Sequence, residues 1–463
     1  MRSATVSLIL ALVSIGSDVR AQDTLPPGTS VRDPKIETIL TEVSEPRIRS
    51  RIEKLAAFDT RHTLSDTKSD TRGIGAARRW IKSEFDRIAI KSNGRLKVEF
   101  DGYVQPPARR VKVETEIVNV VATLPGSKRQ AAERIYVVGG HYDSICSDNE
   151  DAVTDAPGAN DDASGTAVVL ELAEIMSARE FDATIVFVAF AGEEQGLYGS
   201  THFADEAKKA GKRIEAMITN DIVGNTDGSG GRHDNRTLRV FSEGLPDPRT
   251  APLAARLRAV GGENDSPSRQ LARFVKETTA LYTPRFLAKP IFRSDRYLRG
   301  GDHMPFLARN MPAIRFTEPS EQFARQHQDV REENGIAFGD VPGKVDFAYV
   351  ASVARVNAAT MATLALAPAS PVGATIETRK VENDTTLHWD PVNEADLAGY
   401  EVVWRETTAP FWDHVLWVGN LTRATMTELS KDDHHLGVRS VDREGHRSPA
   451  SFALPPIRSE PKK

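Results

Sequence analysis

The chain has 463 residues, which is too long for one ordinary domain and predicts two or three. Hydrophobic residues make up 40% of it, enough for at least one large core, and the formal net charge of −5 is small for this length. These values argue against a nucleic-acid-binding surface and give no indication of a polyanionic partner.

The first 21 residues have the pattern of a secretory signal peptide. Arg2 supplies a short positive region, residues 6–15 are mostly apolar but too short to span a bilayer, and Val19-Arg20-Ala21 offers a small-residue cleavage site. No later segment approaches the ~20 apolar residues that a spanning helix needs, so we expect no stable membrane anchor. The sequence therefore predicts a secreted or periplasmic protein. Its single cysteine, Cys146, excludes an intramolecular disulfide.

Residues 34–367 alternate between helical and strand patterns. Apolar residues recur with helical spacing in four stretches, and short β-branched or apolar runs lie around and between them. The helices are expected at 34–55, 74–88, 164–178 and 347–366. The strands are expected at 96–104, 111–116, 119–124, 134–138, 184–190, 217–219, 238–241 and 313–316. The pattern predicts an α/β fold, a sandwich around a mostly parallel mixed sheet.

The composition changes at Pro368-Ala369-Ser370-Pro371, which we interpret as a linker. Beyond it, short alternating strands with turn residues between them are typical of a small all-β sandwich. We expect a signal peptide at 1–21, an α/β domain at 22–367, a β-sandwich at 372–456 and a disordered tail at 457–463.

Candidate chemical groups follow three of the predicted strands. His141 follows the strand at 134–138, Glu193 and Glu194 follow 184–190, and Asp221 follows 217–219. Open α/β sheets gather their sites at the carboxyl ends of strands, so these groups can converge. Adjacent buried glutamates are costly unless a positive charge lies beside them, and a divalent metal would supply it.

Five side chains are candidate ligands for two metal ions, namely His141, Asp161, Glu194, Asp221 and His327. Imidazole and carboxylate suit zinc, and Asp161 is the natural bridge between two ions. One of the adjacent glutamates would be a ligand and the other a free base. Asp143 has the reach to orient His141. Taken singly, each motif is more often a solvated charge pair, a loop feature or a helix cap, but their order along the chain favours a metal site.

Three segments carry most of these residues. They are Gly139-Gly140-His141-Tyr142-Asp143-Ser144, Pro157-Gly158-Ala159-Asn160-Asp161-Asp162-Ala163-Ser164-Gly165 and Ala191-Gly192-Glu193-Glu194-Gln195-Gly196-Leu197-Tyr198-Gly199-Ser200. Together they resemble the core motifs of the secreted di-zinc aminopeptidase family, which also includes glutamate carboxypeptidases and, more distantly, glutaminyl cyclases. The resemblance covers roughly residues 50–365 and implies a three-layer α/β zinc peptidase domain at 22–367. Residues 372–456 resemble a fibronectin type III domain, with no chemistry visible in it.

The resemblance also implies roles for the candidate residues. His141 and Asp221 would hold one Zn²⁺, Glu194 and His327 the other, and Asp161 would bridge them. Glu193 would be the catalytic base, with Asp143 beside His141. The segment around His327 matches the family only loosely, and His303 is a rival that we expect to be a wall residue. Arg61 is either a substrate contact or a surface arginine.

The sequence thus predicts an exported zinc exopeptidase with two Zn²⁺ per chain, most simply an aminopeptidase acting on peptides. A carboxypeptidase or dipeptidase is the first alternative, because the pocket walls cannot be placed from sequence. A glutaminyl cyclase-like transferase and a non-catalytic protein that binds carbohydrate or protein through its β-sandwich are the others. The complete ligand set beside Glu193 favours an enzyme over a binding protein, although the C-terminal domain could still bind protein or carbohydrate.

Overall fold

A computed structural model describes residues 32–246 and 252–456. The predicted signal peptide and C-terminal tail lie outside the described residues. The chain divides into two compact units, which are described separately: 32–255 with 263–367, and 256–262 with 368–456. No helix among the described residues is long and apolar enough to cross a membrane.

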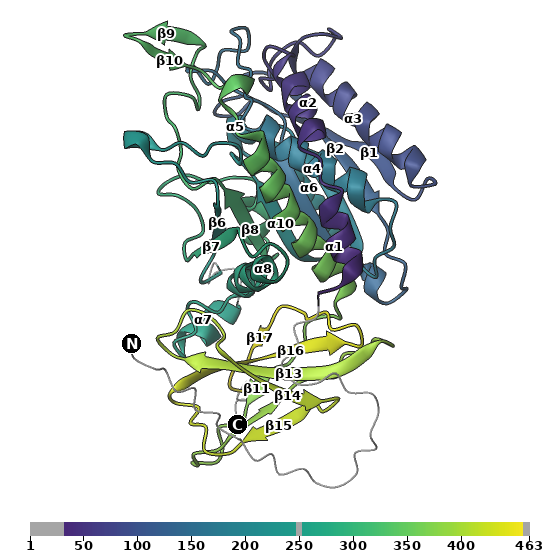
Figure 1. Cartoon of the computed structure of the whole chain (residues 1–463), viewed down its shortest axis with the longest axis vertical. Helices are drawn as coiled ribbons and strands as arrows, with labels where there is room; N and C mark the ends of the chain where they lie inside the picture. Colours follow the sequence, from purple (N-terminus) through teal and green to yellow (C-terminus); the bar gives the residue numbers. More distant parts are fainter. Residues whose placement is uncertain (1–31, 247–251, 457–463) are drawn as a thin grey trace. The chain divides into compact units, whose positions relative to one another are not determined.

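The first unit is built on a mixed sheet of eight strands in the order β1-β2-β4-β3-β5-β8-β6-β7 (Figure 1). Strands β4, β3, β5 and β8 are parallel to one another, whereas β1, β2 and β6 pair with antiparallel neighbours. The strands are β1 (Lys97–Gln105), β2 (Thr115–Leu124), β3 (Arg134–His141), β4 (Thr184–Phe190), β5 (Arg213–Asn220), β6 (Thr237–Ser242), β7 (Leu287–Ile291) and β8 (Ala313–Thr317). The mixed α/β sheet predicted from the sequence is confirmed.

Helices pack on both faces of this sheet and give it three layers. One face is covered by α1 (Pro34–Thr41), α2 (Glu45–Ala56), α3 (Gly73–Lys91), α4 (Ala163–Met176), α8 (Pro267–Tyr282) and α10 (Phe347–Leu366). The other face carries α6 (Tyr198–Lys209) and α9 (Met304–Leu307). The short helices α5 (Glu193–Gly196) and α7 (Pro252–Arg258) and a hairpin of β9 (Arg331–Glu333) with β10 (Ile336–Phe338) complete the described elements.

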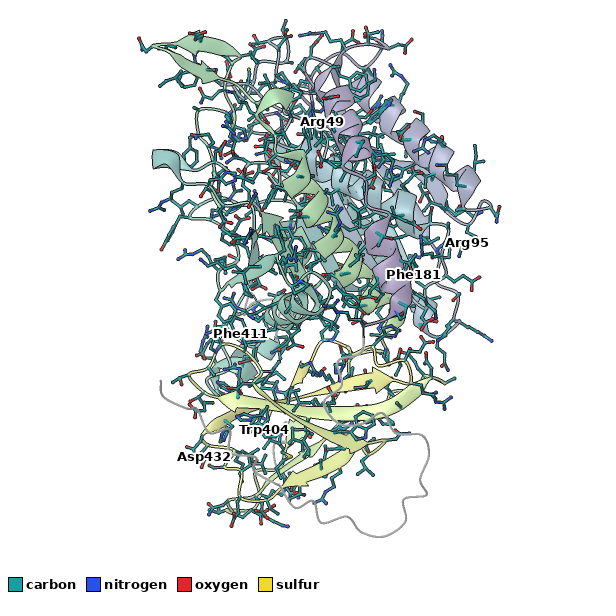
Figure 2. All side chains as sticks on the ribbon, viewed as in Figure 1. Arg49, Arg95, Phe181, Trp404, Phe411 and Asp432 are labelled. Atoms are coloured by element: carbon teal, nitrogen blue, oxygen red, sulfur yellow. The ribbon has the colours of Figure 1, made fainter. Side chains whose placement is uncertain are left out.

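The helix predicted over 34–55 is two helices. Ser44 accepts a hydrogen bond from the backbone N–H of Arg47, and Pro46 occupies the first turn of α2. Both features begin a helix, because a serine cap satisfies a free N–H and proline has no N–H to lose there. Arg49, on this helix, lies with its guanidinium 4.1 Å from the ring centre of Phe347 (Figure 2).

Strand β4 shows how the core is divided between the two faces. All seven of its residues are buried. Its side chains alternate, with Ile185, Phe187 and Ala189 in the larger core beneath α4 and α10. Val186, Val188 and Phe190 belong to the smaller core beneath α6 and α9. A continuous apolar run is what a strand buried on both faces requires, and β4 is one.

The second unit contains antiparallel strands in two sheets. One has the order β11-β12-β15 and the other β14-β13-β16-β17. The strands are β11 (Thr375–Ile376), β12 (Thr385–His388), β13 (Leu397–Glu406), β14 (His414–Gly419), β15 (Arg423–Met426), β16 (His434–Asp442) and β17 (Ser451–Phe452). Leu387, Tyr400 and Val438 lie in their shared core, and Trp404 stacks on His414 with ring centres 5.0 Å apart (Figure 2). The predicted β domain is confirmed, while its fibronectin type III character stays a prediction.

Candidate metal centre

The predicted ligands meet at one edge of the large sheet. His141 is the last residue of β3, Asp221 directly follows β5, and Glu193 and Glu194 form the first turn of α5 after β4. Because β3, β4 and β5 are parallel, their carboxyl ends lie at the same edge. Asp161 comes from the loop before α4, and His327 from the segment between β8 and β9.

Asp161 lies between two histidines. Its Oδ1 is 3.2 Å from His141 Nε2, and its Oδ2 is 2.9 Å from His327 Nε2. His141 Nε2 is also 4.0 Å from Asp221 Oδ1, and His327 Nε2 is 3.1 Å from Glu194 Oε1. The two carboxylate oxygens of Asp161 thus face two ligand sets, which is the arrangement of a bridging ligand. The five predicted ligands are brought together, His327 included.

The contact between His327 and Glu194 supports a metal. Both atoms are close, yet Glu194 Oε1 is buried and makes no hydrogen bond with any described residue. Two ligands of one ion face each other in this way, whereas a donor and an acceptor would align. Potential ligand atoms of His141, Asp161 and Glu194 lie within 4.8 Å of one another. Imidazole with carboxylates is a donor set that zinc accepts.

Glu193 also lies at this centre. One of its carboxylate oxygens is within 4.8 Å of ligand atoms of both His141 and Asp221. The geometry therefore places Glu193 close enough to contact an ion held by those two residues, as well as water beside it. Desolvation by the surrounding protein raises the pKa of Glu193 well above its ordinary value, and the carboxylates of Glu194 and Asp221 add to the rise. A carboxylate that holds a proton readily is suited to general-base work.

The histidines and Asp161 share their charge strongly. Burial opposes a charge on His141, but hydrogen-bonded carboxylates of Asp143 and Asp161 outweigh it and raise the pKa of His141 well above its usual value. Burial likewise opposes the charge on Asp161, and contacts with His141 and His327 nevertheless hold its pKa well below the ordinary value. In the protein without metal, protons on the imidazoles take the place of the missing cations.

Asp143 does a different job from the predicted one. The atom closest to His141 Nδ1 is the backbone oxygen of Asp143, at 3.1 Å, and its carboxylate Oδ1 is 3.6 Å away. That carboxylate accepts hydrogen bonds from the backbone N–H groups of Glu193 and Glu194, at 3.2 and 3.1 Å, and from the hydroxyl of Thr63. It therefore fixes the turn that carries both glutamates, and the residue orients the imidazole mainly through its main chain.

Two further aspartates hold the loop of Asp161. Asp162 accepts hydrogen bonds from the backbone N–H groups of His141, Gly165 and Ile222. Asp340 accepts them from Asn160 and Asp161. At Gly165, an added Cβ would lie 2.1 Å from the backbone oxygen of Asn220, so only glycine allows the start of α4 to approach β5 this closely.

Arg61 is neither a substrate contact nor a surface residue. It is fully buried, and its guanidinium donates to the backbone oxygens of Tyr142, Pro157 and Gly158. It thereby joins the loop after His141 to the loop before Asp161. Asx and helix-cap signals cannot reveal such a role, because the partners of Arg61 are main-chain atoms distant in sequence.

Arg315 and Asp340 were not predicted as parts of the site. Arg315 lies in the buried strand β8, and its Nη2 is 2.8 Å from Asp221 Oδ1. An arginine inside an apolar strand was the available signal. Asp340 lies in a loop with no such signal. His303, the rival ligand, is fully buried, with Nε2 2.9 Å from the backbone oxygen of Ser294, and is not among the clustered ligands.

An α/β fold with buried imidazoles and carboxylates at the carboxyl edge of its sheet defines a metal-dependent hydrolase. Residues 119–334 match Peptidase family M28. A probable zinc metalloprotease of the fungus Leptosphaeria maculans is 48% identical over 421 residues, which cover 91% of this chain and 97% of that protein. The chain belongs to Peptidase family M28 and is a zinc metalloprotease.

Solved structures show the same fold at low sequence identity. The LapA aminopeptidase of Legionella pneumophila matches with a TM-score of 0.51 and 18% identity, over 75% of this chain and 78% of that one. A glutaminyl cyclase of Macrostomum lignano matches with a TM-score of 0.50 and 16% identity, over 74% of this chain and 95% of that one. The fold is therefore shared by a peptidase and a cyclase, and the choice between them depends on the site.

Proposed function

We propose that this zinc metalloprotease is an aminopeptidase that holds two zinc ions. The observation that carries the proposal is Asp161, whose two oxygens face His141 on one side and His327 on the other. His141 and Asp221 would hold one ion, and Glu194 and His327 the other. Zinc bound there would supply Lewis-acid activation of water and of the peptide carbonyl.

Glu193 is the proton carrier in this proposal. Its carboxylate would take a proton from the attacking water and deliver it to the amine that leaves when the C–N bond breaks. The high proton affinity of this residue supports the second half of that transfer. Asp143 would keep Glu193 in position through the backbone N–H that it binds.

Two alternatives use the same fold. A carboxypeptidase or dipeptidase would use the same ligands and recognise another part of the peptide. A glutaminyl cyclase-like transferase would favour a single metal ion, and the complete set of five ligands argues against it. A non-catalytic binding protein would have no need of Glu193 beside such a set.

Blocked peptides separate these functions. The zinc-loaded protein is assayed on a tripeptide with a free amino end, on its N-acetylated form and on its C-amidated form, each with and without a chelator. An aminopeptidase cleaves the free and C-amidated peptides and loses both activities to the chelator. Cleavage of the N-acetylated peptide but not the C-amidated one would instead make it a carboxypeptidase. Cyclisation of an N-terminal glutamine without cleavage would make it a transferase.

The N-terminal pattern supports export of the enzyme to a secreted or periplasmic location. Sequencing the amino end of the protein recovered from its native source tests this, with Gln22 as the expected first residue. An amino end that retains Arg2 would contradict it. The C-terminal β domain would act as an accessory module that binds protein or carbohydrate.

A further inference from the structure

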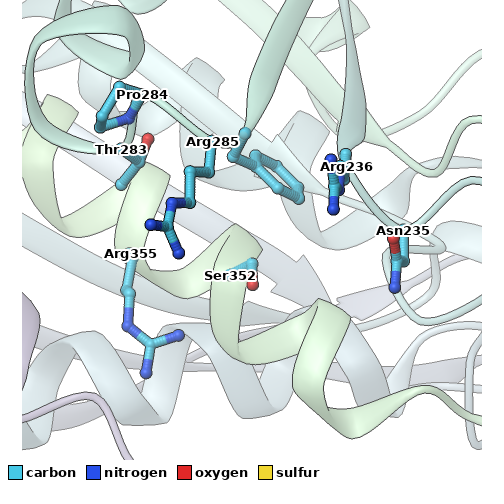
Figure 3. Close-up of a pocket in the computed structure, with 8 residues that line it drawn as sticks. Asn235, Arg236, Thr283, Pro284, Arg285, Ser352 and Arg355 are labelled. Atoms are coloured by element: carbon cyan, nitrogen blue, oxygen red, sulfur yellow. The ribbon is translucent and has the colours of Figure 1, made fainter.

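A cavity of about 430 Å³ lies in the first unit apart from the metal ligands. Figure 3 shows it: Arg285 and Arg355 are on one side, and Arg236 and Asn235 are on the other. Its wall is built from the loop before β6, the segment between α8 and β7, and helix α10. The lining residues are Asn235, Arg236, Thr283, Pro284, Arg285, Phe286, Ser352 and Arg355.

The charge of this cavity is one-sided. Three of its eight lining residues are arginines, and none is an aspartate or glutamate. The acidic residue nearest in sequence, Asp234, has its Oδ1 turned to the backbone N–H groups of Arg236 and Thr237, at 3.0 Å each. Guanidinium groups that face one space repel each other, and an anion placed between them removes that repulsion.

These arginines differ from most others in the described part of the unit. Arg355 makes one long hydrogen bond, 3.5 Å from Nη2 to the backbone oxygen of Val43. No ion pair to an acidic side chain is recorded for Arg236, Arg285 or Arg355 among the described residues. By contrast, Arg47 and Arg51 each lie within 2.7 Å of Glu171. The fork-shaped donors of the cavity are therefore available to a ligand.

The size and the remaining lining indicate an organic ligand. A volume of this order is typical of pockets for small organic molecules. Phe286 supplies an aromatic face, held by packing against Tyr349 with ring centres 5.7 Å apart. Ser352 and Asn235 add polar groups. Arginine pairs bind phosphate oxygens in two-pronged fashion, more strongly than they bind singly charged groups.

We propose that this cavity binds an organic phosphate monoester, with the phosphate between the arginines and the organic group against Phe286. The site is separate from the zinc ligands, and the proposal is independent of the peptidase activity. At pH 7.5 such a phosphate carries a charge of about −2.

Calorimetric titration of the zinc-loaded protein with phenyl phosphate tests this. Phenyl sulfate, with one negative charge, and inorganic phosphate, without the ring, are titrated in parallel, and both are expected to bind more weakly. Arg285→Gln and Arg355→Gln should each raise the Kd for phenyl phosphate about tenfold, since each removes a charge-assisted hydrogen-bond donor. The exposed Arg379→Gln in the other unit is the matched control and should change nothing.

Thermal melts followed by circular dichroism establish that the arginine variants are folded. Charge-retaining Arg285→Lys should keep most of the affinity that Arg285→Gln loses. Absence of saturable binding by the wild-type protein would overturn the proposal. So would binding that survives both glutamine substitutions, because the phosphate would then lie on the zinc ions, or equal binding of phenyl sulfate and phenyl phosphate.

Discussion

The two ends of helix α4 both bury acidic side chains, and they balance the charge in opposite ways. Toward its C-terminal end, Glu171 lies 2.6 Å from Arg47 and 2.7 Å from Arg51, and Glu174 lies 2.6 Å from Lys91. Before its first residue, Asp161 faces two histidines, and the neighbouring acidic residues Glu193, Glu194 and Asp221 share one close guanidinium, that of Arg315.

This difference separates a structural charge cluster from a catalytic one. Buried carboxylates are tolerated when cations and hydrogen bonds compensate them. At the Glu171 end, the protein supplies those cations from α2 and α3. At the Asp161 end, it supplies too few, and the remaining positive charge must come from bound metal. The predictions below test that contrast.

Replacing Glu193 with glutamine should have the largest effect. The amide cannot accept the proton of water, so kcat should fall by roughly 10²–10⁴-fold. Zinc content, measured by elemental analysis of the same sample, should stay at the wild-type value. Loss of zinc together with activity would show that Glu193 is a ligand, a role its distance to His141 and Asp221 also allows.

At the structural end, Arg51→Met should lower the free energy of unfolding by about 3 kcal/mol, because Glu171 loses a buried partner. Chemical denaturation of the zinc-loaded protein measures this. Arg49→Met, on the same helix but half-exposed, is the control and should cost about 1 kcal/mol or less. The number of bound zinc ions should not change in either variant. A lower zinc content in Arg51→Met would mean that the two ends are not independent.

Asp143→Asn should weaken zinc binding by about 10–100-fold, as substitutions behind metal ligands usually do. The amide can no longer accept both backbone hydrogen bonds from the turn of Glu193 and Glu194. Competition with a chromogenic chelator gives the affinity. An unchanged affinity would show that the main chain of Asp143 alone is sufficient to orient the site.

The smallest effect is a pH dependence at Glu174. Burial opposes its charge, but Arg87 and Lys91 hold the pKa of Glu174 at about 2, below its ordinary value of 4.5. A lowered pKa in the folded state stabilises the protein above pH 4.5, and this contribution is lost as the pH falls from there toward 2. Glu174→Gln should therefore cost about 1 kcal/mol at pH 7, and the difference from wild type should narrow below pH 4.5. A difference that is constant with pH would assign the effect to packing.

Much of this contrast could be predicted from the sequence, and the limits have physical causes. The apolar run of β4 and the polar residues after each strand indicated both the sheet and the edge where the site lies, because strand periodicity and strand order act locally. The helix at 198–209 escaped prediction, since its buried positions are small residues such as Gly199, Ser200 and Ala204.

The supports of the site were harder to predict than its ligands. Arg61 acts through backbone oxygens more than 80 residues away in sequence, and Asp340 acts on backbone N–H groups of Asn160 and Asp161. Such partners have no side-chain pattern, so only the folded chain shows them. The role of the Asp143 carboxylate was misassigned for the same reason, because its partners are also main-chain groups.

The zinc content of the wild-type protein and of Asp161→Asn tests the central claim most directly. Elemental analysis after dialysis should find two zinc ions per wild-type chain, and Asp161→Asn should lose at least one of them because it loses the bridging carboxylate. Glu171→Gln, at the other end of α4, should retain both. A wild-type protein with no zinc, or an Asp161→Asn variant that keeps the full complement, would contradict the account.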